Sequence, residues 1–163
     1  MAHKLKILPD QELLVLAYSH EVLPGDFDAV WRAIGASPDY SSDFDDLVLL
    51  GPSTDFSAVS CDLTEKVAGD FVELIKDATA HREKRCAFIC ADNVLGAMAT
   101  MFSAYIYSRA PANVLIEQFA TLDLAFEWID ASKGGSRKVD RAHVTKVLAQ
   151  MGENWCLRRS AAA

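Results

Sequence analysis

Residues 86–102, CAFICADNVLGAMATMF, join a buried strand to the helix that follows it. Residues 86–91 are apolar at every position, which is typical of a strand that is covered on both faces. Further along, apolar side chains recur at the spacing of one helix face: Met98, Met101, Phe102, Tyr105 and Ile106. Pro111 cannot continue this helix. The segment therefore predicts one strand-and-helix unit of an α/β fold.

Strands are predicted on both sides of this unit. Residues 47–50 and 114–116 are short apolar runs, and we expect them to be buried strands of the same sheet. Near the N-terminus, residues 5–7 and 13–17 are separated by too few residues for a crossover helix. These two segments are therefore predicted to form an antiparallel pair.

Four further helices are predicted from apolar side chains at helical spacing. Asp26 and Asp62 are predicted to cap the first two, and the basic residues 81–85 suit the negative end of the second. Thr121 can cap the third, and the last lies within residues 144–155. The order β-β-α-β-α-β-α-β-α with an extra C-terminal helix predicts an α/β fold with a mixed, mostly parallel sheet flanked by helices.

Net charge divides the chain into two parts. Residues 1–131 contain 9 Lys and Arg against 21 Asp and Glu, whereas residues 132–163 contain 7 against 2. We therefore interpret residues 1–131 as the α/β domain and residues 132–163 as a basic linker with a C-terminal helix. A basic segment can dock onto its own acidic body or onto a second copy, which would make a homo-oligomer. Nucleic acid is a less favoured partner because Trp155 is the one aromatic residue available for stacking.

Composition also restricts the setting of the protein. With 163 residues, of which 51% are hydrophobic, the chain can bury one substantial core. No apolar run approaches the roughly 18 to 20 residues that cross a bilayer, and the N-terminus lacks a hydrophobic signal core. We therefore expect no membrane span and a cytoplasmic location. The four cysteines contain no CxxC pair and are interpreted as reduced thiols.

The sequence predicts no catalytic residue, metal site or cofactor. The turn after residues 86–91 offers Asp92 and a single glycine, Gly96, instead of a glycine-rich phosphate loop. Cys86 and Cys90 share one strand face but lie too far apart to hold one metal ion, so they are interpreted as core thiols. The acidic cluster Asp43, Asp45 and Asp46 favours a solvated loop, although such loops can hold a divalent ion weakly.

The loop at residues 51–60 is the most informative candidate site. It follows a buried strand and precedes a helix N-terminus, where ligands gather in open α/β sheets. A phosphate placed there would be stabilised by the positive helix end. The candidate modification or interaction residues are Ser53, Thr54, Ser57, Ser60 and Cys61. A polar loop that supplies only turn and cap residues is the alternative interpretation.

Residues 125–129 read AFEWI and follow the segment VLIEQF at residues 114–119. Together with the element order, these residues make residues 4–131 resemble the SpoIIAA-like branch of the STAS superfamily, which includes sulfate-transporter and anti-sigma-factor-antagonist domains. Antagonists carry Asp-Ser-Ser-Gly-Leu before the second helix. This chain has VSCDL at residues 59–63, so the phosphoacceptor position falls on Cys61.

The resemblance implies a non-catalytic, bacterial-type regulatory module that binds an unidentified protein partner through residues 51–60 and the helix after them. The alternative is a carrier of a small apolar ligand, because the fold is also similar to lipid-carrying CRAL-TRIO (SEC14-like) domains. The candidate pocket residues are Trp31, Met98, Met101 and Phe102. A thiol-dependent enzyme is the least favoured hypothesis, since it depends on Cys61 at a helix N-terminus.

Overall fold

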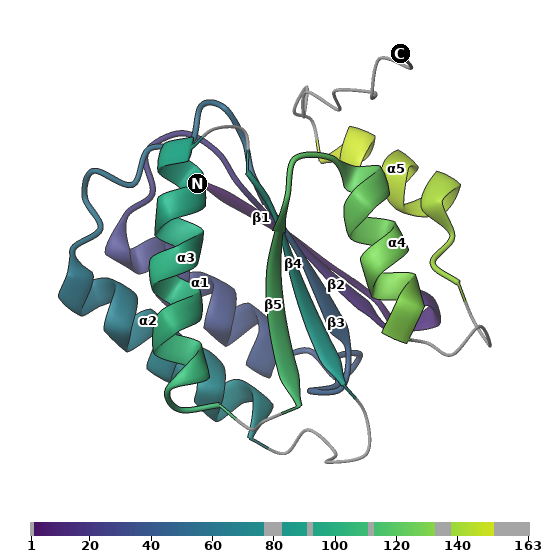
Figure 1. Cartoon of the computed structure of the whole chain (residues 1–163), viewed down its shortest axis with the longest axis horizontal. Coiled ribbons are helices and arrows are strands. Elements are labelled where there is room, and N and C mark those ends of the chain that lie inside the picture. The colour runs from purple at the N-terminus through teal and green to yellow at the C-terminus, as the bar shows by residue number, and fades with distance from the viewer. Residues whose placement is uncertain (1, 77–82, 91–92, 111–112, 133–137, 152–163) are drawn as a thin grey trace.

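The computed structural model describes residues 2–76, 83–90, 93–110, 113–132 and 138–151 of the chain. Over these residues a five-stranded sheet lies between two layers of helices (Figure 1). The strands are β1 (His3–Leu8), β2 (Leu13–Tyr18), β3 (Asp45–Leu50), β4 (Lys84–Cys90) and β5 (Val114–Phe119). The helices are α1 (Pro24–Gly35), α2 (Cys61–Ile75), α3 (Asn93–Tyr107), α4 (Leu122–Ser132) and α5 (Arg141–Gln150), and a short 3-10 helix, η1 (Pro9–Gln11), joins β1 to β2.

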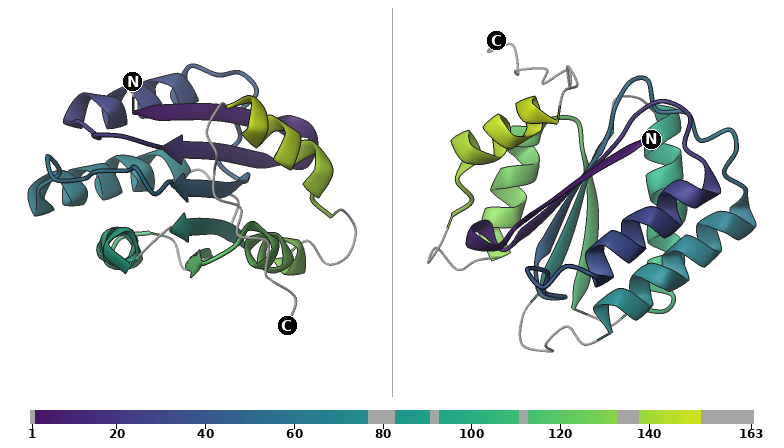
Figure 2. Two further views of the ribbon diagram at one scale, coloured as in Figure 1. Left: turned by 90° about the horizontal axis from the view of Figure 1, so that it is seen from above. Right: turned by 180° about the vertical axis from the view of Figure 1, so that it is seen from behind.

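The strands lie in the sheet in chain order, from β1 to β5. β1 is antiparallel to β2, and the other neighbouring pairs are parallel. The predicted α/β class with a mixed, mostly parallel sheet is therefore confirmed. Right-handed crossovers between strands placed in chain order put every crossover helix on the same face of the sheet. Accordingly, α1, α2 and α3 cover one face, whereas α4 and α5 cover the other (Figures 1 and 2).

Alternate side chains of the central strands supply two separate cores. In β2, Leu14 and Leu16 belong to the core beneath α1, α2 and α3, whereas Leu13 and Val15 belong to the core beneath α4 and α5. All four are almost fully buried. Burial on both faces explains why the central strands are continuous apolar runs rather than alternating ones.

Helix α5 packs on the sheet of its own chain. Val144, Val147 and Leu148 are buried in the same cluster as the inward side chains of β2 and β3. Asp140 caps the helix by accepting a hydrogen bond from the His143 N–H at 3.0 Å. Helix α5 therefore completes the second core. Trp155 and the predicted end of this helix lie outside the described residues, and assembly of two copies stays a prediction.

At the ends of two elements, charged residues occupy other positions than the sequence predicted. α1 begins at Pro24, so Asp26 lies within its first turn and accepts a hydrogen bond from the Leu23 N–H at 3.0 Å. Lys84 and Arg85 belong to β4 and do not close the preceding helix. The strand extends to these residues because the main chain of Lys84 and Arg85 pairs with β5.

Candidate functional site

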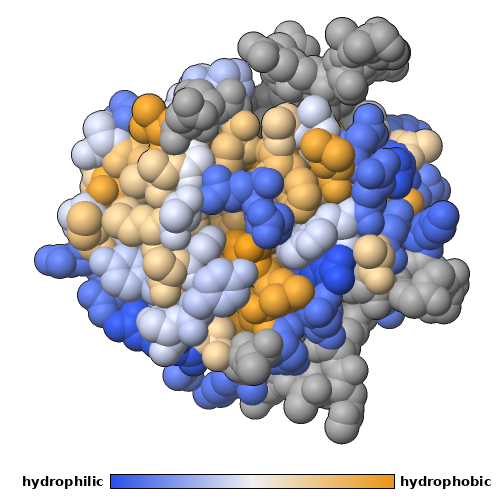
Figure 3. Space-filling model, viewed as in Figure 1, coloured by the Kyte–Doolittle hydropathy of each residue, from blue (hydrophilic) through white to orange (hydrophobic). Residues whose placement is uncertain are grey.

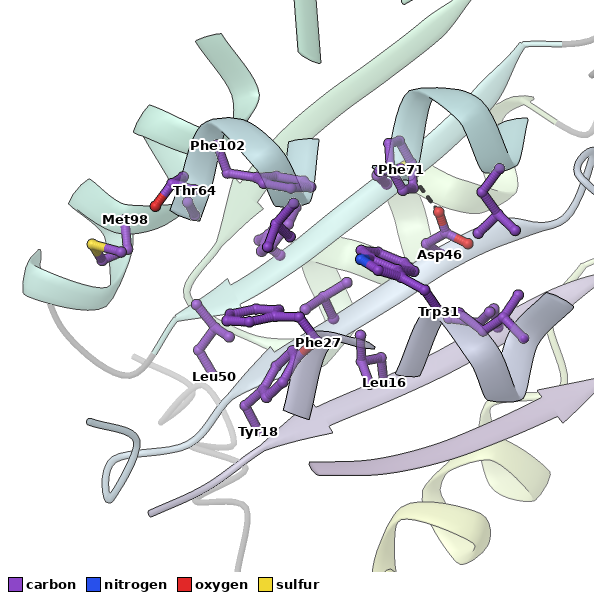
Figure 4. A pocket seen from close by; sticks show the side chains of 18 of the residues that line it. Leu16, Tyr18, Phe27, Trp31, Asp46, Leu50, Thr64, Phe71, Met98 and Phe102 are labelled. Atoms are coloured by element: carbon purple, nitrogen blue, oxygen red, sulfur yellow. Dashed lines mark hydrogen bonds between the residues drawn. The ribbon is translucent and has the colours of Figure 1, made fainter. Parts of the chain in front are cut away.

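A cavity of about 90 Å³ lies between the sheet and helices α1, α2 and α3 (Figure 4). Side chains of β2, β3 and β4 form one wall, and the three helices with residues 40, 56 and 59 form the others. The lining residues are Leu14, Leu16, Tyr18, Phe27, Trp31, Ile34, Tyr40, Asp46, Val48, Leu50, Phe56, Val59, Thr64, Val67, Phe71, Leu74, Cys86, Phe88, Met98, Ala99 and Phe102. Because most of these side chains are hydrocarbon or aromatic, the cavity favours an apolar occupant.

Aromatic rings form a connected wall of the cavity. The Trp31 and Phe71 ring centroids are 6.1 Å apart, and those of Phe71 and Phe102 are 5.9 Å apart. Phe102 also meets Phe88 at 5.8 Å in an edge-on arrangement. Such geometries stabilise aromatic pairs beyond the burial of their area. The rings come from both the sheet and the helices, so these contacts hold the two layers at a defined separation.

One end of the cavity is polar, near the amino-terminal ends of β3 and β4. Lys84 Nζ lies 3.0 Å from Asp46 Oδ2, and the two side chains are only 1% and 6% exposed. The Cys86 thiol donates to the same carboxylate oxygen at 3.2 Å, and Lys84 also donates to the main-chain carbonyl of Phe44. Lys84 and Cys86 alternate along β4, and Asp46 pairs with Cys86 across the sheet. These positions bring the three side chains to one face, where the charges of the ion pair cancel.

The protonation of this polar end follows from burial and from the Asp46 charge. Burial alone would lower the pKa of Lys84, but the neighbouring Asp46 carboxylate raises that pKa above its ordinary value. Burial, and then the Asp46 charge, raise the pKa of the Cys86 thiol well above its ordinary value. Lys84 is therefore a cation and Cys86 a neutral thiol near neutral pH. Neither is a nucleophile in these states.

Two further polar groups occupy the cavity wall without a hydrogen-bond partner among the described residues. They are the indole Nε1 of Trp31 and the hydroxyl of Tyr40, and both atoms are buried. Figure 4 shows the Trp31 ring extending from α1 into the cavity, with its nitrogen at the edge farthest from the helix. Buried polar groups in folded proteins are nearly always hydrogen-bonded. Within the described part of the chain, these two groups therefore keep an unused capacity to donate a hydrogen bond.

The structure brings most of the predicted pocket residues together. Trp31, Met98 and Phe102 line the cavity, whereas Met101 is partly buried and does not line it. Trp31 comes from α1 and the other two from α3, on opposite sides of α2 in the chain. Their role in binding a ligand remains a prediction.

Most of the candidate residues at positions 51–61 are exposed, and two of them also make structural hydrogen bonds. Ser53, Ser57, Ser60 and Cys61 are exposed, and Thr54 is partly buried. The Thr54 hydroxyl donates to the Tyr18 carbonyl at 2.8 Å. Ser60 caps α2 by accepting from the Leu63 N–H at 3.2 Å, so the cap is Ser60 and not Asp62. Phe56 and Val59 of the same loop line the cavity. The loop therefore forms part of the cavity wall. Its Ser and Thr residues, on which the sequence prediction was based, did not indicate this role.

The acidic cluster differs from its prediction as a solvated loop. Asp45 and Asp46 are buried in β3, where they pair with Leu13 and Leu14 of β2, and only Asp43 precedes the strand. Asp45 Oδ1 accepts a hydrogen bond from the Arg85 N–H at 2.9 Å. Within the described ranges, no group of three His, Cys, Asp or Glu side chains is placed to hold a metal ion. Asp92, in the turn after β4, lies outside those ranges.

Sequence reasoning missed the polar end of the cavity. A signal for it was present in β4, where alternate positions are occupied by Lys84, Cys86 and Phe88. Because alternate side chains of a strand share one face, the lysine had to lie beside two core residues. Asp46 likewise precedes Val48 by two positions on β3. No comparable signal identified Tyr40, which lies in the connection between α1 and β3.

The geometry of this cavity is the basis for a functional assignment, and the SpoIIAA-like resemblance remains a prediction from sequence. Comparison of the chain with protein-family models, with curated proteins and with solved structures finds no match.

Proposed function

We propose that this protein binds a small, mostly apolar molecule in the cavity beneath α1, α2 and α3, without covalent chemistry. The supporting observation is an apolar cavity of about 90 Å³ that contains two buried polar groups without partners among the described residues. A well-formed apolar pocket with a few convergent polar groups is the usual form of a small-molecule site. Apolar cavities of about 150 Å³ in other proteins bind benzene, so this one suits a slightly smaller molecule or part of a larger one.

The polar end supports binding rather than catalysis. The thiol of Cys86 is neutral and donates to Asp46, and Lys84 is a cation paired with the same carboxylate. A catalytic thiol or amine needs a lowered pKa, whereas these two groups have raised pKa values. The two buried charges pair with each other, so a ligand would contact the neighbouring aromatic rings.

The apolar side chains that line the cavity differ in their surroundings from those on the surface. The large apolar side chains that are exposed among the described residues are Leu23, Val94, Tyr107 and Leu124. On the face seen in Figure 3, hydrophobic residues gather over α3, with hydrophilic residues beside them. The cavity lining comes from both the sheet and the helices, so it can contact a small molecule on several sides.

Native mass spectrometry of the protein isolated from its own cells tests this proposal. We expect a bound small molecule that is released on denaturation. Ala99 is 2% exposed and lines the cavity, so Ala99→Leu should occupy the space and abolish the bound mass. Ala97 is exposed on the same helix, and Ala97→Leu is the matched control that should retain it. Equal ligand content in the two variants, or only apo mass in the natural protein, would count against the proposal.

A second candidate is the regulatory module predicted from the sequence. Its supporting observation is that the exposed side chains of Ser53, Ser57 and Ser60 lie on one loop, joined through Asp55 to the segment that carries the exposed Leu23. A phosphate on this loop would add about two negative charges beside the segment that carries Leu23. Peptide mass spectrometry of the protein from its own cells should find that phosphate, and a fully unmodified loop would argue for the cavity alone.

A further inference from the structure

The polar end of the cavity carries information about the chemistry of its ligand. We propose that the ligand is an uncharged molecule with a carbonyl-type hydrogen-bond acceptor, as in a ketone, ester or amide, and that Trp31 and Tyr40 bind this acceptor. This inference rests on the proposed function, because it concerns the molecule that occupies the same cavity.

The first argument is the direction of the hydrogen bonds. The indole nitrogen of Trp31 can only donate, and it has no acceptor among the described residues. The Tyr40 hydroxyl is buried in the same wall without a partner in that part of the chain. Burial, and then the charge of Asp46, raise the pKa of Tyr40, so the phenol keeps its proton and can donate it. Two donors without partners in the lining of one apolar cavity favour a ligand that carries an acceptor oxygen.

The second argument is the charge of the site. Lys84 donates to Asp46 and to the Phe44 carbonyl, and it is not among the residues that line the cavity. Its charge is therefore already matched and does not face a ligand. Asp46 does line the cavity, but its charge is matched by Lys84, so the site offers no compensating charge to a carboxylate or phosphate buried there. An ammonium ligand would carry no acceptor for the Trp31 donor. The arrangement therefore favours an uncharged ligand.

The third argument is the cost of leaving either donor without a partner. A buried donor that loses its partner loses the free energy of that hydrogen bond and keeps its desolvation cost. Sites that hydrogen-bond a polar group of the ligand consequently reject analogues that lack the group. A purely hydrocarbon ligand would leave both Trp31 and Tyr40 in that state. We therefore expect the cavity to discriminate between molecules of the same shape according to whether they carry an acceptor.

Titration with three small probes of similar size tests the inference on the complete protein. Acetone carries the acceptor, isobutene has the same shape without it, and acetate adds a charge. The readout is the indole N–H resonance of Trp31, assigned with the Trp31→Phe variant, in a nitrogen-15 correlation spectrum. Binding to the Trp31→Phe variant itself is followed by the methyl resonances of Val48 and Val67, which line the cavity. Trp128, on α4 at the opposite face, provides an internal control whose resonance should not move.

We expect acetone to bind at least as tightly as isobutene, and acetate to bind at least tenfold more weakly than acetone. The Trp31→Phe and Tyr40→Phe variants keep an aromatic ring and remove one donor. Each variant should weaken the binding of acetone by about three- to tenfold, since one neutral hydrogen bond is lost. The affinity for isobutene should stay unchanged.

The outcomes separate the inference from the proposed function. The inference would be overturned if isobutene bound more tightly than acetone. It would also be overturned if the variants lost affinity equally for both probes, because the ligand would then not be the partner of the two donors. The cavity would still be a binding site in that case. Tighter binding of acetate than of acetone would also overturn it. If none of the probes shifted any resonance of a cavity residue, both the inference and the proposed function would fail.

Discussion

At the scale of single residues, Lys84 and Asp46 form a buried ion pair beside the cavity. The two side chains are nearly inaccessible, and the ion pair is 3.0 Å long. Burying two charges offsets much of their attraction, so such a pair contributes little net stability compared with apolar residues of the same size. Removing one partner is different, because the other charge stays buried without compensation.

This asymmetry gives a prediction for Lys84→Met. The free energy of unfolding should fall by about 3 to 5 kcal/mol, because Asp46 is left as an unpaired buried carboxylate. The double variant Lys84→Met with Asp46→Leu should recover most of this loss. Urea unfolding of the single and double variants measures both effects. A double variant that is no more stable than the single one would show that the charges do not act as a pair.

Asp26 controls a second electrostatic effect, at the start of α1. Partial burial raises its pKa, but hydrogen bonds from the Leu23 N–H and the His3 ring outweigh this and hold the pKa of Asp26 below its ordinary value. A lowered pKa in the folded state means that the contribution to stability is complete above the ordinary pKa of about 4. It is lost as the pH falls through the lower, folded-state value.

We therefore expect Asp26→Asn to lower the free energy of unfolding by about 1 kcal/mol at neutral pH. The difference from the natural protein should shrink as the pH falls below about 4, where the carboxylate of the unfolded chain takes up its proton. Urea unfolding at a series of pH values measures this. Asp28, which is exposed on the same helix, provides the control Asp28→Asn. A constant difference at every pH would contradict the assignment.

At the scale of elements, the close approach of α3 to β5 depends on Gly96. A Cβ atom at this position would lie 3.1 Å from Gln118 Oε1, whereas a Cβ atom at Gly69 in α2 would meet nothing within 4 Å. The Gln118 amide is held by a hydrogen bond of 2.7 Å to the Thr100 hydroxyl. Both glycines lie inside helices, so alanine improves the helix propensity equally at the two sites.

The two alanine variants should therefore differ in stability. Gly69→Ala should raise the free energy of unfolding by about 0.5 to 1 kcal/mol through the restricted unfolded chain. Gly96→Ala should gain clearly less or lose stability, since the Gln118 side chain must move. Thermal unfolding of both variants distinguishes them. Equal stabilisation would show that α3 tolerates a methyl group against β5.

Most elements could be predicted from the sequence, and the exceptions share a physical cause. The runs at residues 47–50 and 114–116 are apolar enough to identify central strands without any knowledge of the fold. Lys84 and Asp46 were predicted to lie outside strands because charged side chains are usually exposed to solvent. The interaction that buries them joins residues distant in sequence, and no local pattern contains it. The pocket residues Trp31, Met98 and Phe102 could be proposed for the opposite reason, since each lies on an apolar helix face.

At the scale of the whole molecule, helix α5 of the basic C-terminal segment is part of the fold. The crossover helices all lie on one face, so the other face needs α4 and α5 to bury Leu13, Val15 and Leu47. Leu148 of α5 is 1% exposed in this second core. No helix within the described ranges has the length and apolar character required to cross a membrane. The apolar face of α5 is therefore used against the sheet.

Leu148→Ala should lower the free energy of unfolding by about 2 to 5 kcal/mol, as expected for a large core side chain. Gln150, exposed on the same helix, provides the control Gln150→Ala, which should change stability by less than about 0.5 kcal/mol. Urea unfolding monitored on both the α4 and the α1 side should show one coincident transition. A Leu148→Ala variant as stable as its control would mean that α5 does not hold the second core.

The central claim is that the cavity beneath α1, α2 and α3 accepts an apolar molecule. Xenon is the most direct probe, because it enters apolar cavities without needing a specific polar contact. Methyl resonances recorded under increasing xenon pressure should show saturable shifts for Val48 and Val67, which line the cavity. Val144 and Leu148 of the second core should not shift. Unchanged Val48 and Val67 resonances, or equal shifts in both cores, would contradict the account.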